Sequence, residues 1–130
     1  MLFEADGIRQ RESLAEVTDR VNPGRLEWYR EYRQRRRPAN SLETFIRDDA
    51  MFKKSADSVM DAYSQAWALS FYLAETRPME FARYLKVVSS RNPLEKYDGD
   101  DRVKDFRTAF GHDLEIIETG MLRFYDRLGR

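Results

Sequence analysis

The sequence predicts an all-α fold, a single irregular bundle of about five to six helices around a central apolar helix at residues 57–76. Apolar residues recur at helical spacing through most of the 130-residue chain. The alternating pattern of a half-buried strand is hard to find, and residues that cap helices stand before several apolar stretches. A chain of this length buries enough surface to fold alone, so residues 1–130 are expected to form one helical domain.

The N-terminal part of the chain is expected to be irregular and to lead into two helices. Residues 1–20 carry no clear helical stripe and are interpreted as an irregular lead-in segment. The helix expected at 23–36 has Asn22 as its cap, proline at its first position and an aromatic-rich face. Ser41 starts a short second helix, after which the chain is expected to fold back near Phe52.

The central helix begins with a polar half turn and then becomes apolar on all sides. Its early residues include one aromatic and three polar side chains, Asp61, Tyr63, Ser64 and Gln65. An almost unbroken apolar run follows at 66–74. Because a helix that is apolar all round belongs in the middle of a core, Trp67 is expected to be almost wholly buried between the flanking helices.

Three further helices complete the predicted bundle. The first begins at Pro78, a residue that suits the first helical position. A shorter helix follows the loop SSRNPLEKYDGD and ends at Gly111, which is suited to a left-handed cap. Asp113 is expected to cap the last helix.

Composition excludes several classes of function. No cysteine is present, which removes disulfides, thiolate nucleophiles and cysteine zinc sites. The 23 Lys and Arg residues balance 23 Asp and Glu residues, so no overall field favours nucleic acid or a membrane as partner. The longest apolar run is too short to span a bilayer, and the N-terminus lacks the pattern of a signal peptide. We therefore expect a soluble chain, and its composition indicates no particular compartment.

Two charged stretches resemble binding motifs but have plainer interpretations. The run RQRRRP, which follows several aromatic residues, has the composition of a phosphate- and base-binding surface. Cations at the C-terminus of a helix are also stabilised by the helix dipole, and this interpretation is preferred in a neutral chain. The stretch YDGDD resembles the start of a calcium loop, but Val103 and Ala109 stand where glycine and glutamate are required. It is therefore expected to cap a helix.

His112, the only histidine, is the strongest candidate for a metal ligand. It lies at helical spacing from Glu115 and Glu118, so these three side chains could share an ion. A lone imidazole at a helix start is more often a surface residue, and we expect no metal and no cofactor in this chain. Without cysteine, a second histidine or a G-x-S-x-G motif, the residues alone indicate a non-catalytic chain.

Four segments follow one another along the chain: LFEADGI, GRLEWYREYRQRRRPANSLETFIRDDAMF, YSQAWALSFYL and FRTAFGHDLEIIETGMLRFYDRL. In this order they resemble a bacterial, metallopeptidase-like domain of unknown function in the gluzincin group. The first looks like the stretch after that family's Glu-Gly-Leu-Ala motif. The second is similar to its arginine-rich helix, S-L-E turn and D-x-x-F, and the fourth to its F-G pair and terminal helix. The resemblance covers nearly the whole chain.

This resemblance implies that the chain is the C-terminal helical half of a peptidase MA-like domain. Gluzincins hold zinc with H-E-x-x-H and a further glutamate, and those positions would all lie before Met1. Glu4 matches a later glutamate of the family and is given no metal role. The implied cofactor, zinc, and the implied partner, a zinc-bearing N-terminal half, are therefore expected outside this chain. A peptide is the implied substrate, and this helical half would close one side of its cleft.

The resemblance also implies a purpose for the polar half turn. Related aminopeptidases carry a tyrosine in a Y-x-K/Q-G/A pattern, where it donates a hydrogen bond to the reaction's oxyanion. Tyr63, Gln65 and Ala66 stand in that pattern, which implies an oxyanion-stabilising Tyr63 and a binding role for Gln65. Lysine and glycine of the aminopeptidase pattern are absent here. In the competing structural interpretation, Tyr63 packs against Trp67 in the core with its hydroxyl bonded there.

A second hypothesis, from a different class, is a stand-alone helical module that binds another protein. Its surface would consist of exposed aromatic residues such as Trp28, Tyr29 and Tyr32. The coding region before Met1 discriminates between the two hypotheses. An H-E-x-x-H motif there favours the peptidase, and a start codon without one favours the module.

Overall fold

The computed structural model describes residues 20–128, and this part of the chain is all-helical. The all-α prediction is confirmed. Most of the expected lead-in segment, residues 1–19, lies outside the described residues. The elements are α3 (Pro23–Arg35), α4 (Leu42–Arg47), the 3-10 helix η1 (Ala50–Phe52), α5 (Ala56–Thr76), α6 (Pro78–Ser89), α7 (Gly99–Phe110) and α8 (Leu114–Arg127).

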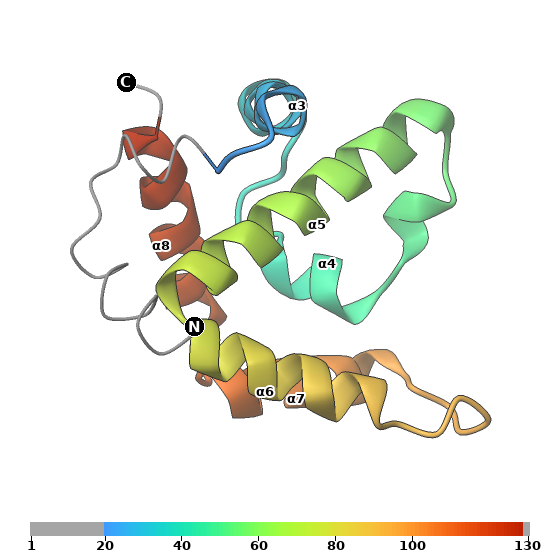
Figure 1. Cartoon of the computed structure of the whole chain (residues 1–130). Helices are drawn as coiled ribbons and strands as arrows, with labels where there is room; N and C mark the ends of the chain where they lie inside the picture. Colours follow the sequence, from blue (N-terminus) through green and yellow to red (C-terminus); the bar gives the residue numbers. More distant parts are fainter. Residues whose placement is uncertain (1–19, 129–130) are drawn as a thin grey trace.

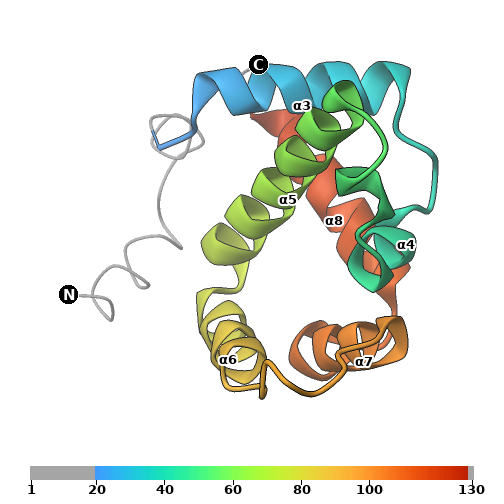
Figure 2. The ribbon, with the colours of Figure 1, turned by 90° about the vertical axis from the view of Figure 1, so that its right-hand side faces the viewer.

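The longest helix, α5, connects the two ends of the bundle (Figure 1). At one end α3 lies across α5 and α8, and at the other end α6 and α7 lie side by side (Figure 2). The short helix α4 contacts both α7 and α8, while η1 packs on α5. The end of α3, α4, η1 and the first turns of α5 therefore enclose one corner of the molecule.

Several helices begin directly after a residue whose side chain caps the helix. Asn22 Oδ1 accepts a hydrogen bond from the backbone N–H of Arg25 at 3.1 Å, and Asp113 caps α8 in the same manner, as expected. Asp98, in the acidic stretch YDGDD, caps α7 by accepting from the Asp101 N–H at 2.9 Å. Ser41 differs from the expectation, because its side chain makes no capping hydrogen bond at the start of α4.

Gly111 ends α7 in a backbone conformation other than the one expected. Its φ is +117° and its ψ is 158°, whereas a left-handed cap has both angles near 50°. The prediction of a left-handed cap is wrong, although the requirement for glycine holds. The positive φ with extended ψ belongs to a region that only glycine occupies readily, because it has no Cβ.

The hydrophobic core is formed mainly by α3, α5, α7 and α8. Aromatic pairs hold its centre: Tyr29 and Tyr125 have ring centroids 5.0 Å apart, and Phe106 and Phe110 are 4.7 Å apart. The largest side chains with almost no exposure are Tyr29, Phe106, Leu42, Leu73, Ile117, Met121 and Leu128. They come from α3, α4, α5, α7 and α8, apart from Leu128, which directly follows α8. This core therefore joins the two ends of the bundle.

Trp67 is not almost wholly buried, and that prediction is wrong. The fully buried residues of α5 include Ala62, Ala68 and Leu73, which lie on a different side of the helix. Trp67 is only partly buried, stacked on Phe71 at 5.5 Å and tilted against Tyr125 at 6.0 Å. After Gln65, helix α5 is apolar on almost all sides, yet the helices of the described region cover only part of its circumference.

Candidate functional site

The polar half turn of α5 is split between the interior and the surface. Asp61, Ser64 and Gln65 are buried, whereas Tyr63 is 51% exposed. Successive residues of an α-helix are rotated by about 100°, so Tyr63 and Gln65 project roughly 200° apart. The structure therefore does not bring the two predicted site residues together.

Tyr63 lies in a hollow of about 360 Å³ between the start of α3 and α5. Arg25, Trp28, Met60 and Ser64 also line this hollow. The tyrosine ring rests edge-on against Phe52, with centroids 5.3 Å apart. Within the described residues its hydroxyl has no hydrogen-bond partner. This is the geometry expected of a donor that faces outward, and a Tyr63 sealed in the core is not observed.

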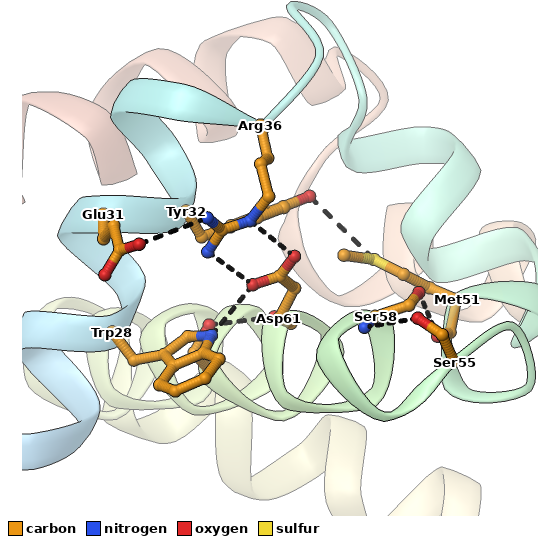
Figure 3. Close-up of polar contacts among 9 residues, drawn as sticks. Trp28, Glu31, Tyr32, Arg36, Met51, Ser55, Ser58 and Asp61 are labelled. Carbon is orange, nitrogen blue, oxygen red and sulfur yellow. Dashed lines mark hydrogen bonds and ion pairs between the residues drawn. The ribbon is translucent and has the colours of Figure 1, made fainter.

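Asp61 is the buried anion that fixes the end of α3 to α5 (Figure 3). It accepts two hydrogen bonds from the Arg36 guanidinium, at 2.9 and 2.8 Å, and one from Trp28 Nε1 at 2.8 Å. The bidentate hydrogen bond to Asp61 raises the pKa of Arg36. Glu31 adds a second, exposed carboxylate to the same guanidinium. Asp61 therefore has a structural role in this helix pair.

Gln65 belongs to a second buried polar cluster. Its Oε1 accepts a hydrogen bond from Arg37 Nε at 3.0 Å, and Arg37 also forms an ion pair with Glu118 of α8. The side chains of Arg37 and Glu118 are only 4% and 7% exposed. Glu118 also accepts from the backbone N–H of Ser41 at 3.2 Å. Two atoms of this cluster, Gln65 Nε2 and Ser41 Oγ, are buried and have no hydrogen-bond partner among the residues that the structure describes.

The arginine-rich run binds its own fold. Arg33 donates to the Asp126 carboxylate and to the Leu122 carbonyl of α8, while Arg36 and Arg37 hold the two buried carboxylates described above. Three of the four arginines between residues 33 and 37 are thus engaged in ion pairs within the described structure. This arrangement supports the plainer interpretation over a phosphate-binding patch.

The aromatic residues proposed for an interaction module are mostly inside the protein. Tyr29 and Tyr32 are 0% and 3% exposed, and Trp28 is partly buried. Burial raises the pKa of Tyr29 to about 12. The expectation that these residues form an exposed binding surface is wrong, because α3 turns this face toward α5 and α8.

The residues His112, Glu115 and Glu118 do not act as a unit. Glu118 is buried against Arg37, whereas His112 and Glu115 are exposed. Among residues 20–128, no group of three or more histidine or acidic side chains is arranged to hold a metal ion. In the same part of the chain, no helix is both long enough and apolar enough to cross a membrane.

The geometry defines a helical domain whose polar interior is built from arginine–carboxylate pairs and whose exposed tyrosine lies in a hollow. The chain belongs to the family described as Protein of unknown function (DUF1570), whose model matches residues 1–95. That match spans α3 to α6 and includes both polar clusters except Glu118. No curated protein and no solved structure matches the chain.

Proposed function

We propose that this chain is a non-catalytic helical portion of a gluzincin-like zinc metallopeptidase and that it closes one side of the substrate cleft. Support comes from the four segments that resemble such a domain in the same order along the chain. In this proposal the zinc ion and its ligands belong to another part of the peptidase, as the resemblance implies. What this chain contributes is a wall of the cleft and one donor group.

The observation that carries the proposal is the free hydroxyl of Tyr63. Neighbouring polar residues Asp61 and Gln65 are buried and bonded to arginines, whereas Tyr63 is half exposed in a hollow and bonded to nothing in the described region. A phenol O–H held in this manner can donate to the negative charge that develops on the carbonyl oxygen of a scissile peptide bond. The rigid α5 backbone and the Phe52 ring orient the donor before substrate arrives.

Gln65 has no part in this proposed cleft. It projects away from Tyr63 and its Oε1 is engaged by Arg37. Its contribution to the peptidase would be to hold α3 against α5, which keeps the helix that bears Tyr63 in place.

The test uses the gene product that carries an upstream H-E-x-x-H segment, assayed with a fluorogenic peptide library. We expect Tyr63→Phe to lower kcat by about a hundredfold, with KM and melting temperature nearly unchanged, because one oxyanion donor is removed. Tyr84→Phe is the matched control, since Tyr84 also has a hydroxyl without a hydrogen bond in the described region and lies on α6. Equal activity of both variants, or a gene without the upstream motif, would contradict the proposal.

A further inference from the structure

A second hollow, of about 400 Å³, lies at the corner formed by the end of α3, α4, η1 and the start of α5. Figure 3 shows part of its wall, where Arg36 and Asp61 face Met51 across the corner. This volume is within the range of small-molecule sites in proteins. Tyr63 does not line this hollow, so a ligand site here is independent of the proposed peptidase role.

Within the part of the chain that the structure describes, two hydrogen-bonding groups of the hollow's lining lack a partner. Gln65 is 1% exposed and its amide nitrogen makes no hydrogen bond. The orientation of this amide is set by Arg37, because a guanidinium can only donate and must therefore face the Gln65 oxygen. The NH₂ group is left over as a donor. The Ser41 hydroxyl is also buried and unpaired, although a serine at this position would ordinarily cap α4.

Buried donors without a partner are costly and uncommon in folded proteins. A bound oxygen atom with free lone pairs would satisfy both Gln65 Nε2 and Ser41 Oγ. The hollow therefore calls for a ligand with an acceptor group such as a carboxylate, whose two oxygens can accept from two donors at once.

The charged side chains of the lining, Arg36, Lys54, Asp48 and Asp61, sum to zero, so the unpaired donors and the nearby ammonium group select the ligand and the overall charge does not. Arg36 pairs with Asp61, and the Asp48 carboxylate, which keeps its charge, accepts a hydrogen bond from the N–H of Ala50 at 2.5 Å. Behind the lining, Arg37 and Glu118 form a second neutral pair. Lys54 lines the hollow and has no carboxylate partner among the described residues. Its ammonium group can pair with a carboxylate bound at the two unpaired donors.

The remaining wall is mainly apolar, with the hydroxyl residues Thr44 and Ser58 as its polar members. Pro38, Phe45 and Met51 line the hollow, and the Tyr32 ring completes this side with its hydroxyl 3.9 Å from the Met51 sulfur. A ligand that fills the hollow therefore needs an apolar body in addition to its charged end.

We propose that this hollow is a binding site for a small molecule or chain end that has a carboxylate group and an apolar body. The carboxylate accepts hydrogen bonds from Gln65 Nε2 and Ser41 Oγ near Lys54, and the apolar body packs on Phe45 and Met51. A free aromatic or aliphatic acid and the C-terminal residue of a peptide both carry this chemistry.

The experiment titrates the ¹⁵N-labelled 130-residue chain with three probes of one shape: 4-phenylbutyrate, 4-phenylbutanamide and 4-phenylbutylamine. We expect the acid to bind with a Kd in the millimolar range or below, shifting the Gln65 side-chain NH₂ and the Ser41 amide resonances. The amide should bind about tenfold more weakly, and the amine not at all. An acid that does not bind, or an amide or amine that binds as tightly, would overturn the proposal. A peptide ending in phenylalanine, with a free or an amidated C-terminus, then distinguishes the two sources of ligand.

Variants of the lining residues locate the site. Ser41→Ala and Lys54→Gln should each weaken binding of the acid about three- to tenfold. Lys53→Gln is the matched control, because Lys53 is the neighbouring exposed lysine, does not line the hollow and pairs with Asp49. Gln65→Glu keeps the acceptor for Arg37 while replacing the donor, and should abolish binding of the acid. Unchanged affinity in Ser41→Ala, Lys54→Gln and a folded Gln65→Glu would place the ligand elsewhere and overturn the assignment.

Discussion

At the scale of single residues, two buried tyrosines, Tyr29 and Tyr125, differ in whether the hydroxyl makes a hydrogen bond within the described residues. Tyr29 and Tyr125 are 0% and 2% exposed, and their rings are in contact. The Tyr125 hydroxyl donates to the Ala68 carbonyl at 2.7 Å, whereas the Tyr29 hydroxyl has no partner among residues 20–128. The two positions thus separate the contribution of a hydrogen bond from that of burying a ring.

Removing each hydroxyl in turn should give effects of different size. We expect Tyr125→Phe to lower the free energy of unfolding by about 1 kcal/mol, because a made hydrogen bond is lost. Tyr29→Phe should be neutral or stabilising by up to about 1 kcal/mol, because an unsatisfied buried hydroxyl is removed. Urea denaturation of the two variants measures both values. A larger loss for Tyr29→Phe than for Tyr125→Phe would contradict the observed hydrogen bonding.

Ionisation of Tyr29 should lower the stability of the fold at alkaline pH. Burial raises the pKa of Tyr29 from 10.0 to about 12. Above pH 10 the unfolded chain loses this proton while the folded chain keeps it, so the contribution is complete below pH 10 and lost as pH rises toward 12. Between these two pH values Tyr29→Phe should lose about 2 kcal/mol less stability than the unmodified chain, measured by urea denaturation at each pH. Parallel curves would show that Tyr29 ionises normally in the fold.

At the scale of elements, the ends of helices are the features most accessible from sequence. Three helices are capped by Asn22, Asp98 and Asp113. Such a cap can be predicted because the side chain bonds to a backbone N–H only two or three residues further along the chain. The conformation of Gly111 could not be predicted in the same way. Its extended ψ depends on how α8 must leave α7, which is a matter of tertiary packing.

Alanine at two glycines should separate a strained backbone from an ordinary one. Gly111→Ala is expected to lower the free energy of unfolding by about 1 to 3 kcal/mol, because φ is +117° although space for the methyl group is open. Gly24→Ala, in the first turn of α3, should stabilise by up to about 1 kcal/mol, since its added Cβ meets only Asn22 Oδ1 at 3.5 Å. Thermal unfolding compares the two. Similar shifts in both would contradict a special backbone at Gly111.

At the scale of the whole molecule, long-range ion pairs determine how the helices meet, and local sequence patterns do not reveal them. Arg37 and Glu118 are 81 residues apart, and helical spacing relates each of them only to its neighbours in the chain. Periodicity likewise shows that α5 is apolar on almost all sides after Gln65. It does not show which side the other helices cover, so it does not place Trp67 correctly. The fold class and helix starts follow from local patterns, whereas both hollows depend on packing between helices.

Breaking the buried ion pair tests its role in holding α3 to α8. Arg37→Met should lower the free energy of unfolding by about 3 to 5 kcal/mol, because Glu118 is left as an uncompensated buried charge. Adding Glu118→Gln should recover part of this loss, since the charge is removed and an acceptor for Ser41 is kept. Arg35 is an exposed arginine in the same run and serves as the control. Its replacement, Arg35→Met, should change the free energy of unfolding by less than about 0.5 kcal/mol. Equal effects at Arg35 and Arg37 would contradict this arrangement.

In the proposed peptidase, the position of Tyr63 relative to the zinc ion decides whether this helical chain forms a wall of the catalytic cleft. We would replace zinc with paramagnetic cobalt(II), label tyrosines with 3-fluorotyrosine and assign fluorine signals with Tyr63→Phe and Tyr84→Phe variants. We expect the Tyr63 signal to show a large shift and broadening on cobalt loading, while the Tyr84 signal on α6 is little changed. A Tyr63 signal that cobalt leaves unaffected would contradict the placement of this tyrosine at the catalytic cleft.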